Sequence, residues 1–420
     1  MSSPPARSLA PPATGLGRWP LAAAAVVTAL FALSNAPTPL YLHWQAELGF
    51  GAHTLTTIFA LYIAGLLLTL PVAGRLADRH GRAAVLVPGV AVAIVASLLF
   101  LTATSVLALA LARLLTGIAV GVAVAAGMAA VVDLGGPSLR AQASLAASIA
   151  MVFGAGLGPL LAGAVAELSD APVVPVFAIA TALLTAAFAL ALLLPLTRPP
   201  RPAAAAPAGG TRLVPSSEHA RLLSPPRVPR ANRRQLALGV AAFAPGISAT
   251  SFVLALGPSL LARLLGGTSP LLAGGTACAM FLSATASQLA ARALPLRALL
   301  LAGCATTALA MAALTAAACA AIVPLLVVAA LLAGTGQGLG QLGGLTLIAT
   351  HVPADRRAEA NAALSSGGYL PAGTLAVATG FLVDALGLVT ATVLFAGALA
   401  AAAAVAAAVI AREPVEPSPT

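Results

Sequence analysis

The densest group of charged side chains lies in the stretch GRLADRHGR, residues 74–82, which holds three arginines, Asp78 and His80. These residue types support ion pairing and hydrogen bonding. A carboxylate such as Asp78 can accept hydrogen bonds at the N-terminus of a neighbouring helix, where the helix dipole favours negative charge. Gly74 and Gly81 permit tight turns and close helix approach. The stretch is therefore either a charged turn between apolar segments or an electrostatic contact to another helix.

Arg113 lies inside an apolar segment, ARLLTGIAVGVAVAAG. An arginine at the centre of a membrane helix costs about 2.5–3.5 kcal/mol on insertion scales. One interpretation is that Arg113 snorkels toward the surface, which reduces that cost. The other is that it lines a cavity, because Arg113, Gly117 and Gly121 share one helical face. There it would bind substrate or influence a neighbour's protonation, but it could not carry a proton, since guanidinium stays charged.

Other polar side chains within apolar segments are candidates to line the same cavity. Asn35 and Thr38 belong to the stretch SNAPTPLY, and Gln337 and Gln341 are four residues apart on one helical face. The glutamines are the better candidates, because isolated Ser and Thr side chains more often bond their own helix backbone. Weaker candidates are Ser248, Thr250, Ser251, Ser287 and Gln288.

No acid or histidine lies at mid-membrane depth, so no proton carrier is evident; the acids nearest the membrane lie at loop edges or helix ends. His43 and Glu47 are four residues apart and form either a pair or a solvated rim. Glu167 and Asp384 are alternatives at matching positions in the two halves. No cluster of residues with metal-ligand spacing is present, and Cys278, Cys304 and Cys319 form no disulfide pattern.

The composition decides what kind of element must position these groups. The apolar fraction is 60% and the mean hydropathy is +1.02, against about 45–50% apolar residues in soluble domains. A run of about 20 apolar residues spans a bilayer. The net charge of +10 comes from arginine alone, and we attribute it to basic cytoplasmic loops rather than to nucleic-acid binding. The first apolar run is too long for the core of a signal peptide.

Twelve apolar segments are long enough to be membrane spans. The predicted spans are 21–42, 54–73, 83–103, 106–132, 142–166, 173–194, 236–261, 269–291, 298–319, 322–348, 360–382 and 386–411. The predicted division is a cytoplasmic tail (1–20), a six-helix bundle (21–194), a basic flexible cytoplasmic linker (195–235), a second six-helix bundle (236–411) and a cytoplasmic tail (412–420).

The arginines predict the orientation. With the N-terminus inside, 19 of the 21 arginines fall on the cytoplasmic side, as the positive-inside rule requires. The exceptions are Arg263 and Arg113. We therefore expect a multi-pass protein of the cytoplasmic membrane with both termini in the cytoplasm.

The two halves resemble each other at an offset of 217 residues. The offset aligns glycines and also charged residues: Arg140 with Arg357, Gly163 with Gly380, and Glu167 with Asp384. Two halves of like topology predict parallel repeats with a substrate path between them.

The stretch 74–82 closely resembles the signature between spans two and three of the major facilitator superfamily. The resemblance extends to the twelve spans, the repeat and the basic linker, and it implies an all-α membrane protein of twelve transmembrane helices in two six-helix pseudo-repeats. It implies that Asp78 docks against the start of the eleventh helix in the outward-facing state, and that Arg82 pairs with Asp133. The implied switch comprises Gly74, Asp78, Arg79, Gly81, Arg82 and Asp133. The second half keeps only ARALPLR, 291–297, which has no acid.

Span five contains GAGLGPLLAG, residues 154–163. Gly154 and Gly158 permit close helix packing, and Pro159 bends the helix. With Gly163, the order resembles the span-five signature of the family's drug:proton antiporters, although Ala162 replaces a glycine. Tight packing alone is the other interpretation.

These resemblances imply a secondary transporter that works by alternating access, with proton-coupled export of small amphiphilic or apolar molecules as the favoured activity. The alternative is an importer or facilitator of a metabolite such as a sugar or an organic acid, whose carboxylate Arg113 would bind. An enzyme is disfavoured because no nucleophile with a histidine or paired acids lies at membrane depth. An ATP-driven pump is excluded for this chain alone, because it lacks a phosphate-binding loop. The expected partners are a small-molecule substrate, protons and the bilayer, without nucleic acid, cofactor or metal, and we expect a functional monomer.

Overall fold

The computed structural model describes residues 15–196, 232–353 and 356–412, and within these ranges every regular element is a helix. Twelve helical segments of the described chain are long and apolar enough to cross a membrane. Most of the predicted linker, 195–235, and parts of both predicted tails lie outside the described residues. The helix after the linker begins at Arg233, so the last residues of that predicted segment are helical.

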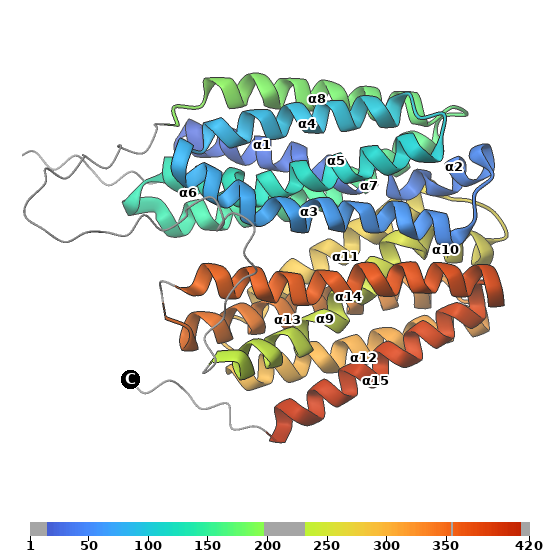
Figure 1. Ribbon diagram of the computed structural model, residues 1–420. Coiled ribbons are helices and arrows are strands. Elements are labelled where there is room, and N and C mark those ends of the chain that lie inside the picture. Colours follow the sequence, from blue (N-terminus) through green and yellow to red (C-terminus); the bar gives the residue numbers. More distant parts are fainter. Residues whose placement is uncertain (1–14, 197–231, 354–355, 413–420) are drawn as a thin grey trace, which may run out of the picture.

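The elements before the linker form a first helix group, in the upper half of Figure 1. Its elements are α1 (Arg18–Asn35), η1 (Thr38–Leu40), α2 (Tyr41–Leu48), α3 (Ala52–His80), α4 (Ala83–Leu101), α5 (Val106–Val122), η2 (Ala123–Gly127), α6 (Met128–Gly135), η3 (Pro137–Leu139), α7 (Arg140–Glu167) and α8 (Val173–Leu193).

The elements after the linker form a second helix group, in the lower half of Figure 1. Its elements are α9 (Arg233–Ala255), α10 (Gly257–Leu265), α11 (Pro270–Ala290), α12 (Leu296–Ala320), α13 (Val323–His351), α14 (Arg357–Leu386) and α15 (Leu388–Arg412).

The first membrane span is broken near its middle. α1 ends at Asn35, and the chain continues through η1 and α2 as a second helical piece. Pro37 and Pro39 cause the break, because a proline has no N–H to bond the carbonyl one turn earlier. The break leaves carbonyl groups at the end of α1 that need other donors.

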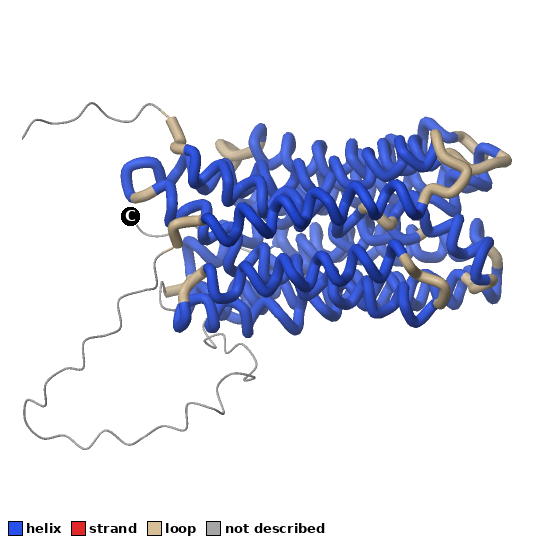
Figure 2. Tube along the Cα trace, turned by 90° about the horizontal axis from the view of Figure 1, so that it is seen from above, coloured by secondary structure: helices blue, strands red, loops and turns tan. Residues whose placement is uncertain are grey.

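Two helix pairs make most of the contact between the groups, α3 with α14 and α7 with α11, and smaller contacts join η1 with α11, α2 with α10 and α3 with α9. Figures 1 and 2 show the helices running side by side along one common axis. Glycines allow two of the closest approaches. A Cβ on Gly163 would lie 2.3 Å from the carbonyl oxygen of Pro270, and one on Gly380 would lie 2.8 Å from that of Ala52. These two glycines are the pair that the 217-residue offset aligns.

The two ends of the helix bundle differ in charge. The basic end carries the start of α1, the α3–α4 turn, α6 and the end of α15; its charged residues include Arg18, Arg82, Arg140, Arg297 and Arg412. The opposite end carries α2, α10 and the start of α3, with charged or titratable residues His43, Glu47, His53, Glu167, Asp170, Arg263 and Asp384.

The prediction that residues 74–82 form a loop is wrong for most of the stretch. α3 continues as a helix to His80, and the turn occupies only Gly81 and Arg82. The helix continues because arginine, leucine and alanine are good helix formers once the chain has left the apolar region. Gly81 ends it with a φ of 93°, a conformation that glycine adopts without strain.

Candidate functional site

Arg113 is fully buried on α5, so the interpretation that it snorkels to the surface is wrong in this conformation. Its Nη1 donates a hydrogen bond of 2.6 Å to the carbonyl oxygen of Ser34. That carbonyl lies in the last turn of α1, just before the break at Asn35. A cation is favourable at this place because the C-terminal end of a helix is the negative end of its dipole. Arg113 therefore stabilises the broken first span.

Three aromatic rings surround the rest of the Arg113 guanidinium group. Its central carbon lies 5.0 Å from the ring of Tyr62, 5.3 Å from that of Phe59 and 5.8 Å from that of Tyr41. These distances are within the range of cation–π attraction, which is stronger for a desolvated cation. The first two rings belong to α3 and the third to α2. We call Arg113 with these three rings the arginine cage.

The arginine cage holds polar atoms that lack a protein partner. Nε and Nη2 of Arg113 are buried without an acceptor, and the hydroxyl of Tyr41 is buried without a partner as well. Thr38 Oγ1 and Trp44 Nε1, in the same broken span, are also unpartnered. Each of these five atoms can donate a hydrogen bond. An unmet buried donor costs about 1–3 kcal/mol, so this region favours a ligand or water that supplies acceptors.

The free edge of Arg113 has a specific shape. Nε and one terminal nitrogen form the side-on fork of a guanidinium group, and this fork matches the two oxygens of a carboxylate. The other terminal nitrogen is already used by Ser34. The arrangement can therefore hold the arginine through one nitrogen and bind an anion through the remaining two.

The other predicted cavity residues lie in different helix groups: Asn35 in the first, and Gln337 and Gln341 in the second. Asn35 is buried, and its Nδ2 donates to Ser34 Oγ at 3.0 Å and to the carbonyl of Ala155 on α7 at 3.4 Å. It therefore lies beside the end of α1 that Arg113 contacts. Gln341 lies in the second group, where its Oε1 accepts from Gln288 Nε2 at 3.4 Å. Gln337 is half-buried on α13, and its backbone packs against Gly246 of α9.

The charged cluster at the α3–α4 turn is held together by Arg82. Its Nη1 lies 2.7 Å from Asp78 Oδ1, and its Nε lies 3.3 Å from Asp133 Oδ2 at the end of α6. The Asp78 side chain is 69% exposed. Arg79 is exposed, and a Cβ on Gly74 would meet nothing within 4 Å. The structure thus brings Asp78, Arg82 and Asp133 together and leaves Gly74 with open space beside it.

The span-five glycines pack against two different helices. A Cβ on Gly154 would lie 2.4 Å from the carbonyl oxygen of Thr28, and one on Gly158 would lie 2.0 Å from that of Ala32, both on α1. Gly163 instead faces Pro270 of α11. Pro159 is buried within α7, and its carbonyl approaches Gly274 of α11. The signature therefore serves close packing both within the first group and between the groups.

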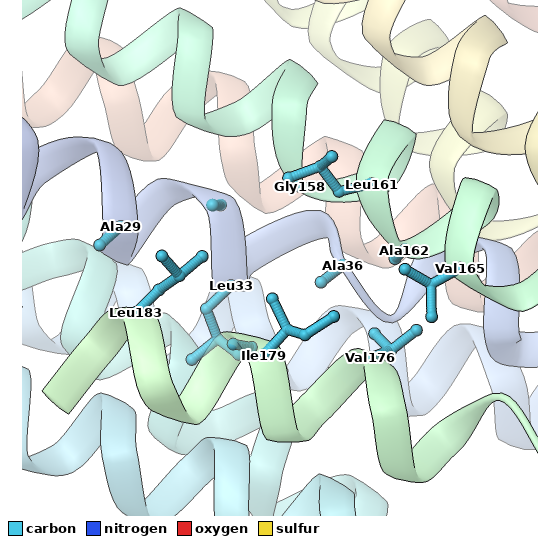
Figure 3. Close-up of a pocket in the computed structure, with 12 residues that line it drawn as sticks. Ala29, Leu33, Ala36, Gly158, Leu161, Ala162, Val165, Val176, Ile179 and Leu183 are labelled. Atoms are coloured by element: carbon cyan, nitrogen blue, oxygen red, sulfur yellow. The ribbon is translucent and has the colours of Figure 1, made fainter. Parts of the chain in front are cut away.

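An apolar cavity of about 100 Å³ lies among α1, α7 and α8 (Figure 3). Its lining includes Leu33, Gly158, Leu161, Ile179 and Leu183. Ligand pockets for drug-sized molecules usually measure about 300–1,000 Å³. This cavity is smaller, and its lining residues all belong to the first group, so we do not assign it as the central site.

The opposite end contains two polar contacts between the groups. On α14, Asp384 accepts hydrogen bonds of 2.9 Å from the backbone N–H groups of Ala52 and His53, and its Oδ2 lies 2.6 Å from His53 Nδ1. On α7, Glu167 accepts from the N–H of Leu271 at 3.0 Å and from Ser269 Oγ at 3.3 Å. The His43–Glu47 pair, 3.6 Å apart, lies at this end as well and is exposed.

Sequence reasoning missed the arginine cage rings and His53. The aromatic residues Tyr41, Phe59 and Tyr62 carry no pattern that distinguishes them from ordinary core residues. The 217-residue offset relates Asp384 to Glu167, but it places His53 opposite Pro270 and so gives no sign of the contact between His53 and Asp384.

Solved structures of membrane transporters are similar to this chain in fold. The crystal structure of a point mutant of the nucleoside transporter NupG superimposes with a TM-score of 0.69 at 13% identity, covering 93% of this chain and 99% of that one. A bacterial homolog of the human lysosomal transporter Spinster, in an inward-facing and unoccupied conformation, gives a TM-score of 0.66 at 16% identity, with 94% and 96% covered. Its occupied inward-facing form gives 0.67 at 15% identity, with the same coverage.

No curated protein matched. The model described as Major Facilitator Superfamily matches residues 21–318 and 281–420, which together cover nearly the whole described chain. With the twelve candidate spans and the fold likeness, this match shows that the chain belongs to the Major Facilitator Superfamily and is a multi-pass membrane transporter by family and fold.

Proposed function

We propose that this protein is a secondary transporter whose substrate carries a carboxylate or a similar anionic group, and that Arg113 binds this group. The two helix groups would rock against each other and expose the site to one side of the membrane at a time. The observation that carries the proposal is the unpartnered fork of a fully buried arginine. Inside a low-dielectric site, such a fork and a carboxylate form a strong, charge-assisted pair.

The position of the arginine cage fits this proposal. Tyr62 and Phe59 lie on α3, the helix of the first group that contacts α14 of the second. All members of the cage belong to the first group, so a separation of α3 from α14 would leave the cage together and would uncover its α3 side. Arg113 is closed to solvent in the present conformation, so entry of substrate requires a movement of this kind.

We propose that the basic end faces the cytoplasm, following the positive-inside rule. The contacts made by Asp384 and Glu167 would then hold the outer side closed, and the structure would correspond to a state facing inward or occluded. The exposed carboxylate of Asp78 is consistent with this assignment, because its docking to the eleventh span is expected in the outward-facing state. In the same proposal Gly74, Arg79, Gly81, Arg82 and Asp133 belong to that switch.

Proton-coupled export of amphiphilic or apolar molecules is the second candidate. It is favoured by the order of Gly154, Gly158, Pro159 and Gly163 in span five. These residues have packing roles that serve either direction of transport, and the apolar cavity beside them is small. An anionic substrate makes direct use of the buried charge, so we rank it first.

Transport of matched substrates by the purified protein in liposomes tests the proposal. A panel of small monocarboxylates would be compared with their methyl esters and primary amides, in both directions and with or without a pH gradient. We expect saturable, Arg113-dependent transport of acids, and little transport of the esters and amides beyond that of empty liposomes. Equal transport of acids and neutral analogues would contradict the anionic class and favour the second candidate.

The variant Arg113→Lys separates binding from folding. A lysine keeps the charge and one donor for the Ser34 carbonyl, but it cannot form a bidentate fork. A hydrogen bond to a charged group contributes about 1.5–3 kcal/mol, so we expect the apparent affinity for the acid to fall roughly 10- to 150-fold. The control is Arg263→Lys, which changes an exposed arginine on α10. Wild-type affinity in Arg113→Lys would overturn the assignment.

A further inference from the structure

The two contacts at the opposite end are related by the internal repeat. Asp384 is the 217-residue equivalent of Glu167, and Ala52 and His53 are the equivalents of Ser269 and Pro270. In each contact, a carboxylate near the end of one long helix binds the N-terminus of a helix in the other group. We call the first the α14–α3 latch (Asp384, Ala52 and His53) and the second the α7–α11 latch (Glu167, Ser269 and Leu271).

The α14–α3 latch supplies a cap that α3 lacks. The N-cap residue of α3 is Gly51, which has no side chain to bond the first N–H groups. Asp384 fills that role from the other helix group. In contrast, α11 has its own N-cap, because Ser269 accepts a hydrogen bond from the N–H of Leu272. Opening the bundle at this end therefore leaves the start of α3 uncapped, whereas α11 keeps a cap.

The two latches also differ in the side chain that stands beside the carboxylate. In the α14–α3 latch, the imidazole of His53 lies 2.6 Å from the Asp384 carboxylate. In the α7–α11 latch, Pro270 occupies the equivalent position and carries no ionisable group. Histidine is the side chain whose charge normally changes between pH 5 and 8. The repeat has thus produced one latch with a proton-binding group and one without it.

The surroundings of His53 accommodate the charged imidazole. Nδ1 faces Asp384, Nε2 lies 3.0 Å from Thr54 Oγ1, and the ring stacks on Phe381 with centroids 5.1 Å apart. A hydroxyl can accept from a protonated Nε2 or donate to a neutral one. The His53 side chain is 45% exposed and Asp384 is 35% exposed, so protons can exchange with the solution at this end.

Few other charges bear on His53. From the helices packed on α3, Asp384 is the charged group of α14 that contacts the ring, and Arg113 of α5 faces α3 deeper in the bundle, at Phe59 and Tyr62. α4 and η2 contain no charged residue, and the arginines of α9 lie at its basic-end start. In the part of the chain that the structure describes, the other charged groups or titratable polar groups at this end are His43, Glu47, Glu167, Asp170, Arg263 and Cys319.

We propose that His53 and Asp384 form a proton-binding site that couples the pH of the solution at the opposite end to closure of that end. Protonated His53 and ionised Asp384 attract each other only while α3 and α14 are together. A proton on His53 therefore favours closure, because it creates an attraction that only the closed conformation makes. This inference rests on the alternating access proposed above, but it does not depend on the identity of the substrate.

Distance measurements without substrate test the coupling. Spin labels would be attached at Thr104 and Ile322, two loop positions in different groups at the opposite end and away from both latches. The three native cysteines would first be replaced by alanine. In the full-length protein in lipid nanodiscs, we expect the ratio of closed to open populations to rise about two- to fivefold as the pH falls from 8 to 5.5, the range of an exposed ion pair.

Three variants decide the outcome. His53→Gln keeps a hydrogen-bond donor but cannot be charged, and we expect it to remove most of the pH dependence. Glu167→Gln is the matched control: it weakens the α7–α11 latch, so the closed population should fall while its pH dependence remains. Asp384→Asn should lower the closed population and remove the pH dependence together. An unchanged pH dependence in His53→Gln would overturn the proposal, and so would its loss in Glu167→Gln alone.

Failure of this proposal is distinguishable from failure of the proposed function. If the distances never report more than one population in any variant or with any carboxylate present, alternating access itself is contradicted. If two populations exist but His53→Gln responds to pH like the wild type, only the proton site is wrong.

Discussion

Substitution of Gly380 by alanine should shift the protein away from the closed conformation of the opposite end. A Cβ at this position would lie 2.0 Å from Thr56 Oγ1, 2.8 Å from the Ala52 carbonyl oxygen and 2.9 Å from His53 Cα. The threonine hydroxyl can rotate away, but the two backbone atoms cannot. The methyl group therefore forces α14 and α3 apart wherever the two helices are closed on each other.

The magnitude follows from the cost of overpacking. An inserted methyl group in a tightly packed site costs about 1–3 kcal/mol, which corresponds to a roughly 5- to 150-fold change in an equilibrium constant. Because the contact joins different helix groups, opening that end relieves the clash. We therefore expect the cost to appear in the ratio of closed to open populations and only weakly in thermal stability.

Gly158→Ala is the matched comparison. Its Cβ would lie 2.0 Å from the Ala32 carbonyl oxygen, but this contact is within the first group and persists in either conformation. We expect Gly158→Ala to lower Tm and leave the population ratio unchanged. The assay is the Thr104–Ile322 distance distribution together with the melting temperature. If Gly380→Ala lowers Tm as much as Gly158→Ala and leaves the distances unchanged, the reasoning is refuted.

Three further substitutions test other parts of the structure. A Cβ added at Gly74 would meet no atom within 4 Å in this conformation, so Gly74→Ala should leave Tm unchanged within experimental error. Close packing of α3 at this glycine in the outward-facing state would make the same substitution lower transport. A large loss of Tm would contradict the packing described. Asp78→Asn should cut transport sharply with membrane insertion near normal, because the exposed Asp78–Arg82 pair adds little stability; unchanged transport would remove its switch role. Phe177→Ala removes a fully buried ring stacked 4.8 Å from Phe100 and should destabilise the protein by about 3–5 kcal/mol, measured by denaturant unfolding.

Hydropathy predicted the number of spans and their approximate positions, because the bilayer sets the length of an apolar helix. It could not predict their ends at the basic side. α3 runs on to His80 because helix formation does not stop where the apolar composition does.

The sequence predicted the central residue of the candidate site but not the residues that contact it. The cost of burying Arg113 identified it from sequence, but its acceptor, Ser34, is 79 residues away and becomes available only because the first span breaks. The partner of His53 is Asp384, 331 residues further along the chain. Local sequence patterns cannot specify contacts between residues so far apart in the chain, although the internal repeat drew attention to Asp384.

Alternating access is the central claim, and two distances measured in one sample test it most directly. The Thr104–Ile322 pair reports on the opposite end, and labels at Ser138 and Leu294, exposed positions in different groups, report on the basic end. On addition of a transported carboxylate, the two distance distributions should change in opposite senses, one end closing as the other opens. If both distances stay fixed, or if both lengthen or both shorten together, the account is contradicted.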